Sequence, residues 1–231
     1  MNFEGINAND RDEEKYDGFK GKKHLIDTSV GKVFVLELGE SQGPTCLLIH
    51  GWSKSAGLKQ WKFMFEPLIK EGYRVFAIDM PGFGHSQSAI RLFSARSDDN
   101  LLKDGPVDVI EQILNKLNID KFNIFGFSWG GGVAISLAIK FKSRILKIAL
   151  LMPSYTEQKD ELKQINVSTL ILWIKEDQIH PYKLGRLLAS RIKLCTLIER
   201  SIGTLTISSE DNNRKINSFS IPVFTKFLNE N

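Results

Sequence analysis

Short apolar runs alternate with longer amphipathic stretches along most of the chain. Residues 45–50 and 168–174 are nearly continuous apolar runs, which is typical of strands buried on both faces of a sheet. Residues 107–117 instead carry an apolar side chain every three or four positions, as a helix with one buried face does. On these criteria we expect strands at residues 24–30, 33–38, 45–50, 73–79, 121–125, 145–152, 168–174 and 194–198, and helices at residues 61–69, 107–117, 130–139, 157–165, 183–192 and 219–228. The alternation predicts an α/β fold with a mostly parallel, twisted sheet of about eight strands and helices on both faces.

A single domain accounts for this pattern. The length of 231 residues is ordinary for one domain. Residues 1–22 are polar, and we expect them to form a disordered arm ahead of one domain at residues 23–231. The interval between the strands at 145–152 and 168–174 has room for only one crossover helix. We therefore expect no large lid domain.

The composition argues against several classes of function. The chain has 31 lysines and arginines against 27 aspartates and glutamates, and the net charge of +4 is spread along the sequence. No basic stripe with interleaved aromatic residues is present, so nucleic-acid binding is not expected. Two cysteines, Cys46 and Cys195, cannot make a disulfide framework. The N-terminus has no apolar signal segment and no apolar run could span a bilayer, so we expect a cytoplasmic protein without membrane insertion.

The candidate chemistry centres on one pentapeptide. Residues 126–130 read Gly-Phe-Ser-Trp-Gly. The pattern Gly-x-Ser-x-Gly places a serine on a sharp, strained turn between a strand and a helix, so that its hydroxyl projects above the sheet. A predicted strand at 121–125 precedes the motif, and an apolar helix at 130–139 follows it. In this context the motif predicts that Ser128 is a nucleophile.

Four landmarks carry a resemblance to a known family. They are His-Gly-Trp at 50–52, Asp-Met-Pro-Gly-Phe-Gly-His-Ser at 79–86, the pentapeptide with one further glycine at 126–131, and Lys-Glu-Asp-Gln-Ile-His-Pro at 175–181. In this order and spacing they resemble the α/β-hydrolase family over residues 24–229. The resemblance implies the α/β-hydrolase fold and a serine hydrolase that needs no metal and no cofactor.

The resemblance also implies a role for each of several residues. Ser128 would be the nucleophile, and the backbone N–H groups of Trp129 and Trp52 would form the oxyanion hole. Asp177 would be the acid that orients a histidine, since residues 150–154, the other place where the family carries its acid, hold no carboxylate. The resemblance implies structural roles for the histidines and the aspartate of the first two landmarks.

The expected base is missing from its usual place. The family carries its histidine in the loop after the last strand, often in a Gly-His pair. Residues 201–205 here read Ser-Ile-Gly-Thr-Leu, so Thr204 stands where the histidine is expected. A serine hydroxyl is a poor nucleophile until a base takes its proton, and threonine cannot do so near neutral pH.

Three explanations of the missing histidine remain open at this stage. The protein is a degenerate hydrolase that binds a ligand and turns it over poorly, or another histidine replaces the base, or residues 199–220 reflect an error in the gene model. His180 is the first candidate for a substitute base, because it lies three residues after Asp177. His50 and His85 are further candidates, because their loops are expected near the same edge of the sheet.

Two functions follow from these alternatives. The first is a serine hydrolase that acts on a small ester, amide or acyl-group substrate through an acyl-enzyme on Ser128, with activity impaired by the replacement near Thr204. The second is a catalytically degenerate α/β-hydrolase-fold protein used for ligand binding or signalling. Both predict a small-molecule acyl substrate or ligand as the partner, and the sequence does not indicate any protein partner.

Overall fold

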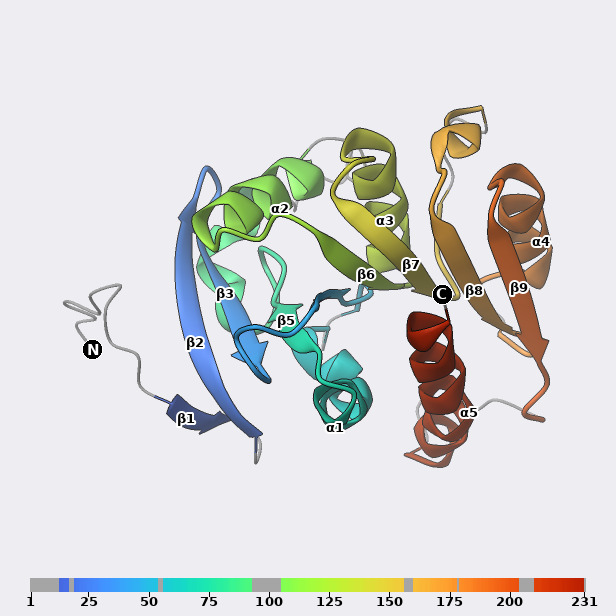
Figure 1. Ribbon diagram of the computed structural model, residues 1–231, viewed down its shortest axis with the longest axis horizontal. Helices are drawn as coiled ribbons and strands as arrows, with labels where there is room; N and C mark the ends of the chain where they lie inside the picture. The colour runs from blue at the N-terminus through green and yellow to red at the C-terminus, as the bar shows by residue number, and fades with distance from the viewer. Residues whose placement is uncertain are drawn as a thin grey trace.

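The protein is built on one nine-stranded sheet, seen in a computed structural model that describes residues 13–16, 19–53, 56–92, 105–155, 160–177, 179–203 and 210–230. The strands are β1 Glu13–Tyr16, β2 Phe19–Thr28, β3 Gly31–Leu38, β4 Thr45–Ile49, β5 Arg74–Ile78, β6 Phe122–Phe127, β7 Ile145–Leu151, β8 Ser168–Ile174 and β9 Cys195–Arg200. They lie in the order β1-β2-β3-β5-β4-β6-β7-β8-β9, and Figure 1 shows the sheet running from β1 and β2 at one side to β9 at the other. From β5 to β9 every neighbouring pair is parallel, whereas β1, β2 and β3 are antiparallel to their neighbours.

The strand order creates a switch point beside β4. The chain moves from β4 to β5 on one side and later returns to place β6 on the other side. In an open parallel sheet, the loops that leave two such strands diverge and leave a crevice at the carboxyl edge, where ligands bind. The loops after β4 and β6 are those that carry Trp52 and Ser128.

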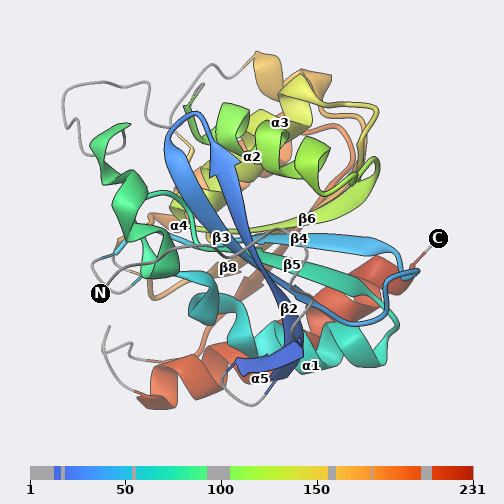
Figure 2. The same ribbon diagram turned by 90° about the vertical axis from the view of Figure 1, so that its left-hand side faces the viewer.

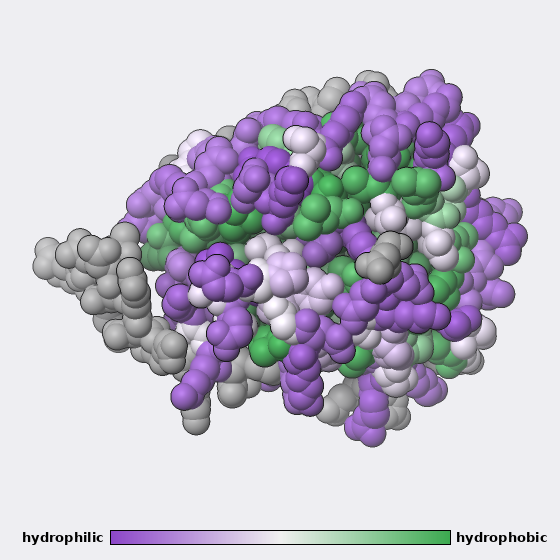
Figure 3. Space-filling view, viewed as in Figure 1, coloured by the Kyte–Doolittle hydropathy of each residue, from purple (hydrophilic) through white to green (hydrophobic). Residues whose placement is uncertain are grey.

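Helices cover both faces of the sheet. On one face lie α1 Lys62–Lys70 and α5 Glu210–Asn229, which contact each other, and on the other lie α2 Gly105–Lys116, α3 Trp129–Lys140 and α4 Tyr182–Arg191 (Figures 1 and 2). Three 3-10 segments, η1 Leu58–Trp61, η2 Gly84–Leu92 and η3 Glu161–Gln164, complete the regular structure. In the space-filling view, hydrophobic residues gather in a band between hydrophilic residues above and below (Figure 3). None of the described helices is long and apolar enough to cross a membrane.

Aromatic side chains join α1, α5 and the sheet. Trp61, which precedes α1, meets Phe125 of β6 edge-on with ring centroids 5.7 Å apart. Phe125 makes a second edge-on contact with Phe224 of α5 at 5.5 Å. All three side chains are fully buried, and edge-to-face contacts of this kind add to the stabilisation from burial alone. The final helix is therefore fixed to the sheet beneath the carboxyl edge.

The predicted α/β architecture with a mostly parallel sheet is confirmed, but its N-terminal boundary was placed too late. The ninth strand is β1. Both β1 and the start of β2 lie in the segment that was expected to be a disordered arm. These residues form antiparallel backbone ladders, with Lys22 opposite Glu37. A polar edge strand is held by such backbone pairing, so it leaves no apolar pattern in the sequence.

The connection from β7 to β8 carries no lid domain. Its described part contains only the single turn η3 Glu161–Gln164, in place of the longer helix expected at residues 157–165. Leu162 is buried and fixes this turn against the domain. The carboxyl edge is consequently not covered by an inserted domain at this point of the chain.

Candidate active site

Ser128 occupies a strained turn between β6 and α3. Its backbone angles are φ 50° and ψ −117°, a conformation that L-residues other than glycine rarely adopt. The surrounding sheet holds it in place, because the Ser128 N–H donates to the carbonyl of Leu151 at 3.0 Å and the Ser128 carbonyl accepts from the Ser154 N–H at 2.8 Å. The predicted elbow geometry is therefore present.

The two glycines that flank Ser128 let the backbone segments approach closely. A Cβ on Gly126 would lie 2.5 Å from the carbonyl oxygen of Gly130, inside the turn itself. A Cβ on Gly130 would lie 2.3 Å from the carbonyl oxygen of His50, at the end of β4. A side chain at Gly126 would therefore force the turn open, and one at Gly130 would push the turn away from the end of β4.

Asp177 organises a tight turn after β8. Its Oδ1 accepts the backbone N–H groups of Ile179 at 2.7 Å and His180 at 3.1 Å, the pattern of an Asx turn. The turn folds the chain back so that the His180 ring meets the same carboxylate, with Nδ1 2.7 Å from Oδ2. The carbonyl of His180 is also held by the indole N–H of Trp173 at 3.2 Å. Spacing of three residues thus brings acid and imidazole together locally.

The structure brings Ser128, His180 and Asp177 into one chain of hydrogen bonds. The Oγ of Ser128 lies 2.8 Å from Nε2 of His180, whose Nδ1 faces Asp177. The His180 and Asp177 side chains are only 13% and 11% exposed, so water competes weakly for these contacts. Serine, imidazole and carboxylate are therefore connected in the order that nucleophilic catalysis requires.

The ionised state of Asp177 determines which ring nitrogen of His180 carries the proton. Burial alone would raise the pKa of Asp177, but hydrogen bonds from the His180 ring and from two backbone N–H groups outweigh it and leave the pKa below its usual value. A carboxylate can only accept hydrogen bonds, so the Nδ1 of His180 carries a proton toward it. Nε2 is then left to accept the hydroxyl proton of Ser128.

The two backbone N–H groups that the resemblance implies for an oxyanion hole come from the start of α3 and the loop after β4. Trp129 begins α3, so its N–H points out of the positive end of the helix dipole. Trp52 lies in the loop after β4, where Gln60 accepts the Gly51 N–H at 2.8 Å. Within the described part of the chain, neither tryptophan N–H donates to another protein group. Gln60 was missed by sequence reasoning, because nothing in the local pattern shows that its side chain bends back to Gly51.

The two tryptophan side chains have different surroundings. The Trp52 side chain is 48% exposed and lines the cavity, whereas Trp129 is buried beneath it with ring centroids 5.3 Å apart. The indole N–H of Trp129 is buried and has no hydrogen-bond partner among the described residues. Trp52 therefore forms part of the mouth of the site, and Trp129 supports it from below.

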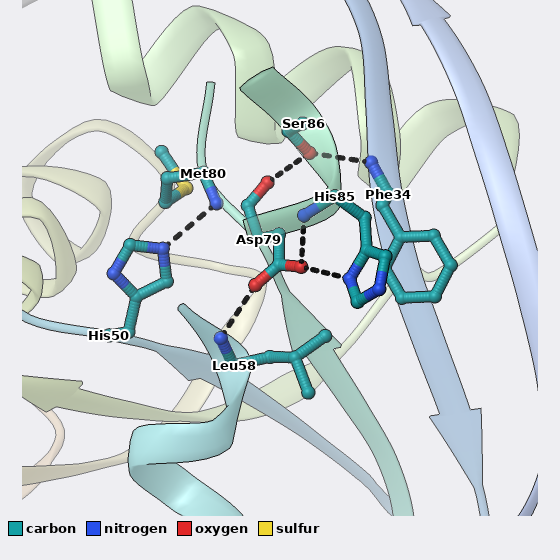
Figure 4. Close-up of polar contacts among 7 residues, drawn as sticks. All are labelled: Phe34, His50, Leu58, Asp79, Met80, His85 and Ser86. Atoms are coloured by element: carbon teal, nitrogen blue, oxygen red, sulfur yellow. Dashed lines mark hydrogen bonds and ion pairs between the residues drawn. The ribbon is translucent and has the colours of Figure 1, made fainter. Parts of the chain in front are cut away.

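The histidines and the aspartate of the first two landmarks form a hydrogen-bonded network around the loop after β5. Asp79 accepts N–H groups from Leu58 at 2.7 Å and His85 at 2.8 Å, and its Oδ2 also meets His85 Nδ1 at 2.9 Å (Figure 4). His50 uses both ring nitrogens, since Nδ1 pairs with the Gly51 carbonyl and Nε2 accepts the Met80 N–H. Burial lowers the pKa of His50. These contacts fit the structural roles expected for these residues.

The place where the family carries its histidine lies at the edge of the described structure. β9 ends at Arg200. The next two residues contact Glu176, whose carboxylate accepts hydrogen bonds from the Ser201 hydroxyl and the Ile202 N–H. Thr204 lies outside the described residues. His180, from the loop after β8, is the imidazole that contacts Ser128.

A cavity of about 970 Å³ opens beside the nucleophile. Its lining includes Ser128, His180 and Trp52 at one end, together with residues of η1, α1 and α5. The described residues contain no group of three or more histidines, cysteines, aspartates or glutamates that could hold a metal ion. Burial raises the pKa of the Cys195 thiol to about 12 and that of Cys46 still further, so neither cysteine offers a second nucleophile at neutral pH.

Comparison with known proteins decides the family. A family model described as the alpha/beta hydrolase fold matches residues 44–166, which is more than half of the chain. The chain belongs to the α/β-hydrolase family. The matched residues include the loop after β4, the landmark at 79–86 and the serine elbow, so the α/β-hydrolase resemblance stated from the sequence is confirmed.

Curated α/β-hydrolase relatives match the chain over part of their own length. Abhydrolase domain-containing protein abhd-5.2 of Caenorhabditis elegans is 34% identical over 144 residues, which is 61% of this chain and 31% of that protein. The 2-hydroxy-6-oxononadienedioate/2-hydroxy-6-oxononatrienedioate hydrolase of Escherichia coli (strain K12) is 32% identical over 108 residues, 46% of this chain and 35% of that protein. The matched region thus spans about a third of each of these relatives.

Solved structures agree with the α/β-hydrolase fold over nearly the whole chain. The crystal structure of a predicted CIB-like hydrolase from Thermoplasma acidophilum has a TM-score of 0.73 and 23% sequence identity, and covers 90% of this chain and 100% of its own. Identity this low supports the common fold and carries no statement about substrate.

Proposed function

We propose that this α/β-hydrolase is a serine hydrolase that acts on a small ester, amide or acyl-group substrate through an acyl-enzyme on Ser128. The observation that carries the proposal is the chain of contacts from Ser128 Oγ to His180 Nε2 at 2.8 Å and from His180 Nδ1 to Asp177 at 2.7 Å. Serine needs an adjacent base to act as a nucleophile, and an imidazole oriented by a carboxylate is such a base.

The proposed reaction begins with attack by the serine. His180 Nε2 takes the hydroxyl proton as Ser128 Oγ bonds to the carbonyl carbon of the substrate. The carbonyl oxygen gains a negative charge, which the N–H groups of Trp52 and Trp129 would stabilise at the positive end of α3. When the carbonyl re-forms, the bond to the leaving alcohol or amine breaks, and His180 returns the proton to it.

Water completes the cycle by the same route. His180 removes a proton from a water molecule, whose oxygen attacks the acyl carbon on Ser128. Collapse of the second tetrahedral intermediate releases the carboxylic acid and returns the proton to Ser128 Oγ. Asp177 remains ionised throughout and stabilises the imidazolium that forms twice in the cycle.

In this proposal His180 replaces the histidine that the family carries after its last strand. The acid and the base then come from a single Asx turn, in place of two separate loops. The impaired activity expected from Thr204 does not follow if His180 acts as the base, since the proton acceptor is restored. Relatives that are named as hydrolases agree with a hydrolytic reaction but do not identify the substrate.

The alternative is a ligand-binding protein that keeps the fold and cavity without turnover. Hydrolysis of nitrophenyl acetate by wild type, Ser128→Ala and His180→Ala separates the two functions. The proposal predicts turnover by wild type that either substitution reduces to the background rate. A folded wild-type protein that does not turn over this ester, or the same rate in all three proteins, would contradict it.

A further inference from the structure

The inner side of α1 forms one wall of the cavity beside Ser128. Along η1 and α1, exposed and half-buried side chains form two neighbouring stripes. Lys59, Lys62 and Glu66 are exposed, whereas Phe63 and Pro67 are half-buried and lie one position further around the helix. All five line the cavity, so the polar stripe forms its solvent rim and the apolar stripe forms its wall.

The opposite wall comes from α5. Ile216 and Ile221 are half-buried, and both line the cavity. The next stripe of α5 faces inward, where Ser220 and Phe224 are fully buried. Trp61 lies between the helices at the base of the cavity, fully buried, with its indole N–H donating to the sheet. The space between α1 and α5 is therefore a groove in which apolar side chains of both helices face each other above Trp61, with Asn217 and the polar rim residues of α1 beside them.

The groove begins beside Ser128, and the residues that line it on α1 and α5 end at Pro67 and Ile221. α1 starts near the carboxyl edge, just after the loop that carries Trp52, and runs toward the opposite edge of the sheet. At its far end Glu71 accepts a hydrogen bond from Asn229 at the end of α5, at 2.7 Å. The two helices lie side by side in both ribbon views (Figures 1 and 2).

We propose that the groove between α1 and α5 binds the unbranched hydrocarbon chain of the acyl group whose carbonyl reacts at Ser128. This inference rests on the proposed hydrolase function and names its substrate class, an ester of a short or medium-chain carboxylic acid. The apolar side chains of Phe63, Ile216 and Ile221 can contact methylene groups, and the same cavity is lined by Ser128 and His180.

The size of the groove sets an expectation for chain length. Its wall along η1 and α1 runs from Gln60 to Pro67, a rise of about 10 Å at the pitch of a helix. Each methylene that moves from water into the groove is expected to raise kcat/KM about fourfold, since burial stabilises the bound chain. The gain should end when the chain extends beyond Pro67.

The test compares nitrophenyl esters from acetate to decanoate. Wild-type kcat/KM is expected to rise from acetate to octanoate. Ile221→Trp places an indole in the groove and should lower the octanoate-to-acetate ratio at least tenfold. Ser218→Trp is the matched control, because Ser218 is exposed on the same helix and does not line the cavity. A wild-type ratio near one, or an unchanged ratio in folded Ile221→Trp, would overturn the inference.

Two further measurements separate this inference from the proposed function. If Ile221→Trp fails to fold, Ile221→Ala provides the test. A wider groove should move the preferred ester toward decanoate. An unchanged preference would contradict the inference. Calorimetric titration of Ser128→Ala with sodium octanoate tests the groove without turnover. Octanoate binding without ester hydrolysis in wild type would refute only the hydrolase proposal. Acetate hydrolysis with a flat chain-length profile would refute only the groove.

Discussion

Two aspartate–histidine pairs stand at the carboxyl edge of the sheet and look alike at short range. Asp79 follows β5 and meets His85 Nδ1 at 2.9 Å, and Asp177 follows β8 and meets His180 Nδ1 at 2.7 Å. Each aspartate also accepts two backbone N–H groups. Considered only as ion pairs, the two sites are nearly equivalent.

The difference lies on the other side of each imidazole. The His180 side chain is 13% exposed, and its Nε2 faces Ser128 Oγ. The His85 side chain is 52% exposed, and its ring packs on Phe34 with centroids 4.6 Å apart. Asp79 connects the start of η1 to the loop after β5, whereas Asp177 holds the histidine that contacts Ser128. The contrast teaches that what the second imidazole nitrogen contacts distinguishes the pair proposed for catalysis from the structural one.

The largest expected effect distinguishes the two histidines. His180→Ala should lower kcat/KM for nitrophenyl acetate by about 10⁶-fold, as should Ser128→Ala, because each removes a member of one catalytic unit. His85→Ala should leave kcat/KM within a few-fold of wild type. Steady-state kinetics on the three variants checks this, and comparable losses in His85→Ala and His180→Ala would remove the distinction between the pairs.

Replacing each aspartate by asparagine should affect a different property of the protein. Asp177→Asn is expected to cost about 10⁴-fold in kcat, because the amide no longer holds the imidazole in the required tautomer. Asp79→Asn should instead lower the free energy of unfolding by about 1–3 kcal/mol, because an amide presents a donor to groups that themselves donate.

Urea unfolding and kinetics on both variants give the comparison. A large loss of stability in Asp177→Asn with little loss of kcat would show that both aspartates are structural. The opposite pattern in Asp79→Asn would place the landmark at 79–86 in the chemistry.

The smallest effect concerns pH. Burial opposes ionisation of Asp177, but hydrogen bonds from His180 and the turn backbone hold its pKa below the usual value. The carboxylate therefore keeps its charge at every pH above the usual carboxyl range, about pH 4, and replacing Asp177 by a group that never ionises should not change the shape of the kcat/KM profile above that pH. A profile of kcat/KM against pH that falls with a slope near two above about pH 5 would mean that the carboxylate takes up a proton there.

The parts of the site that the sequence predicted are those encoded locally. Gly126 and Gly130 flank Ser128 within a strand-turn-helix segment, so a few neighbouring residues specify its strained conformation. The resemblance to the α/β-hydrolase family implied Asp177 as the acid, and the spacing from Asp177 to His180 was the signal for a substitute base. That spacing could not establish the contact with Ser128, because the two loops follow different strands.

Other features depend on contacts that leave no pattern in the sequence. The edge strand β1 and the first residues of β2 are polar, and backbone hydrogen bonds hold them to the rest of the sheet. The carboxamide of Gln60 reaches the loop after β4 only because η1 folds back on it. The groove beside Ser128 is lined by two helices that are distant in the sequence, α1 and α5. Each of these requires the assembled fold.

Labelling with a reactive fluorophosphonate tests the central claim, that His180 activates Ser128. Mass spectrometry of wild type should find one adduct, on Ser128, and none in Ser128→Ala. His180→Ala should label at least a hundredfold more slowly, while His85→Ala should label at the wild-type rate. A folded wild-type protein that takes no label, or a His180→Ala variant that labels as fast as wild type, would contradict the account.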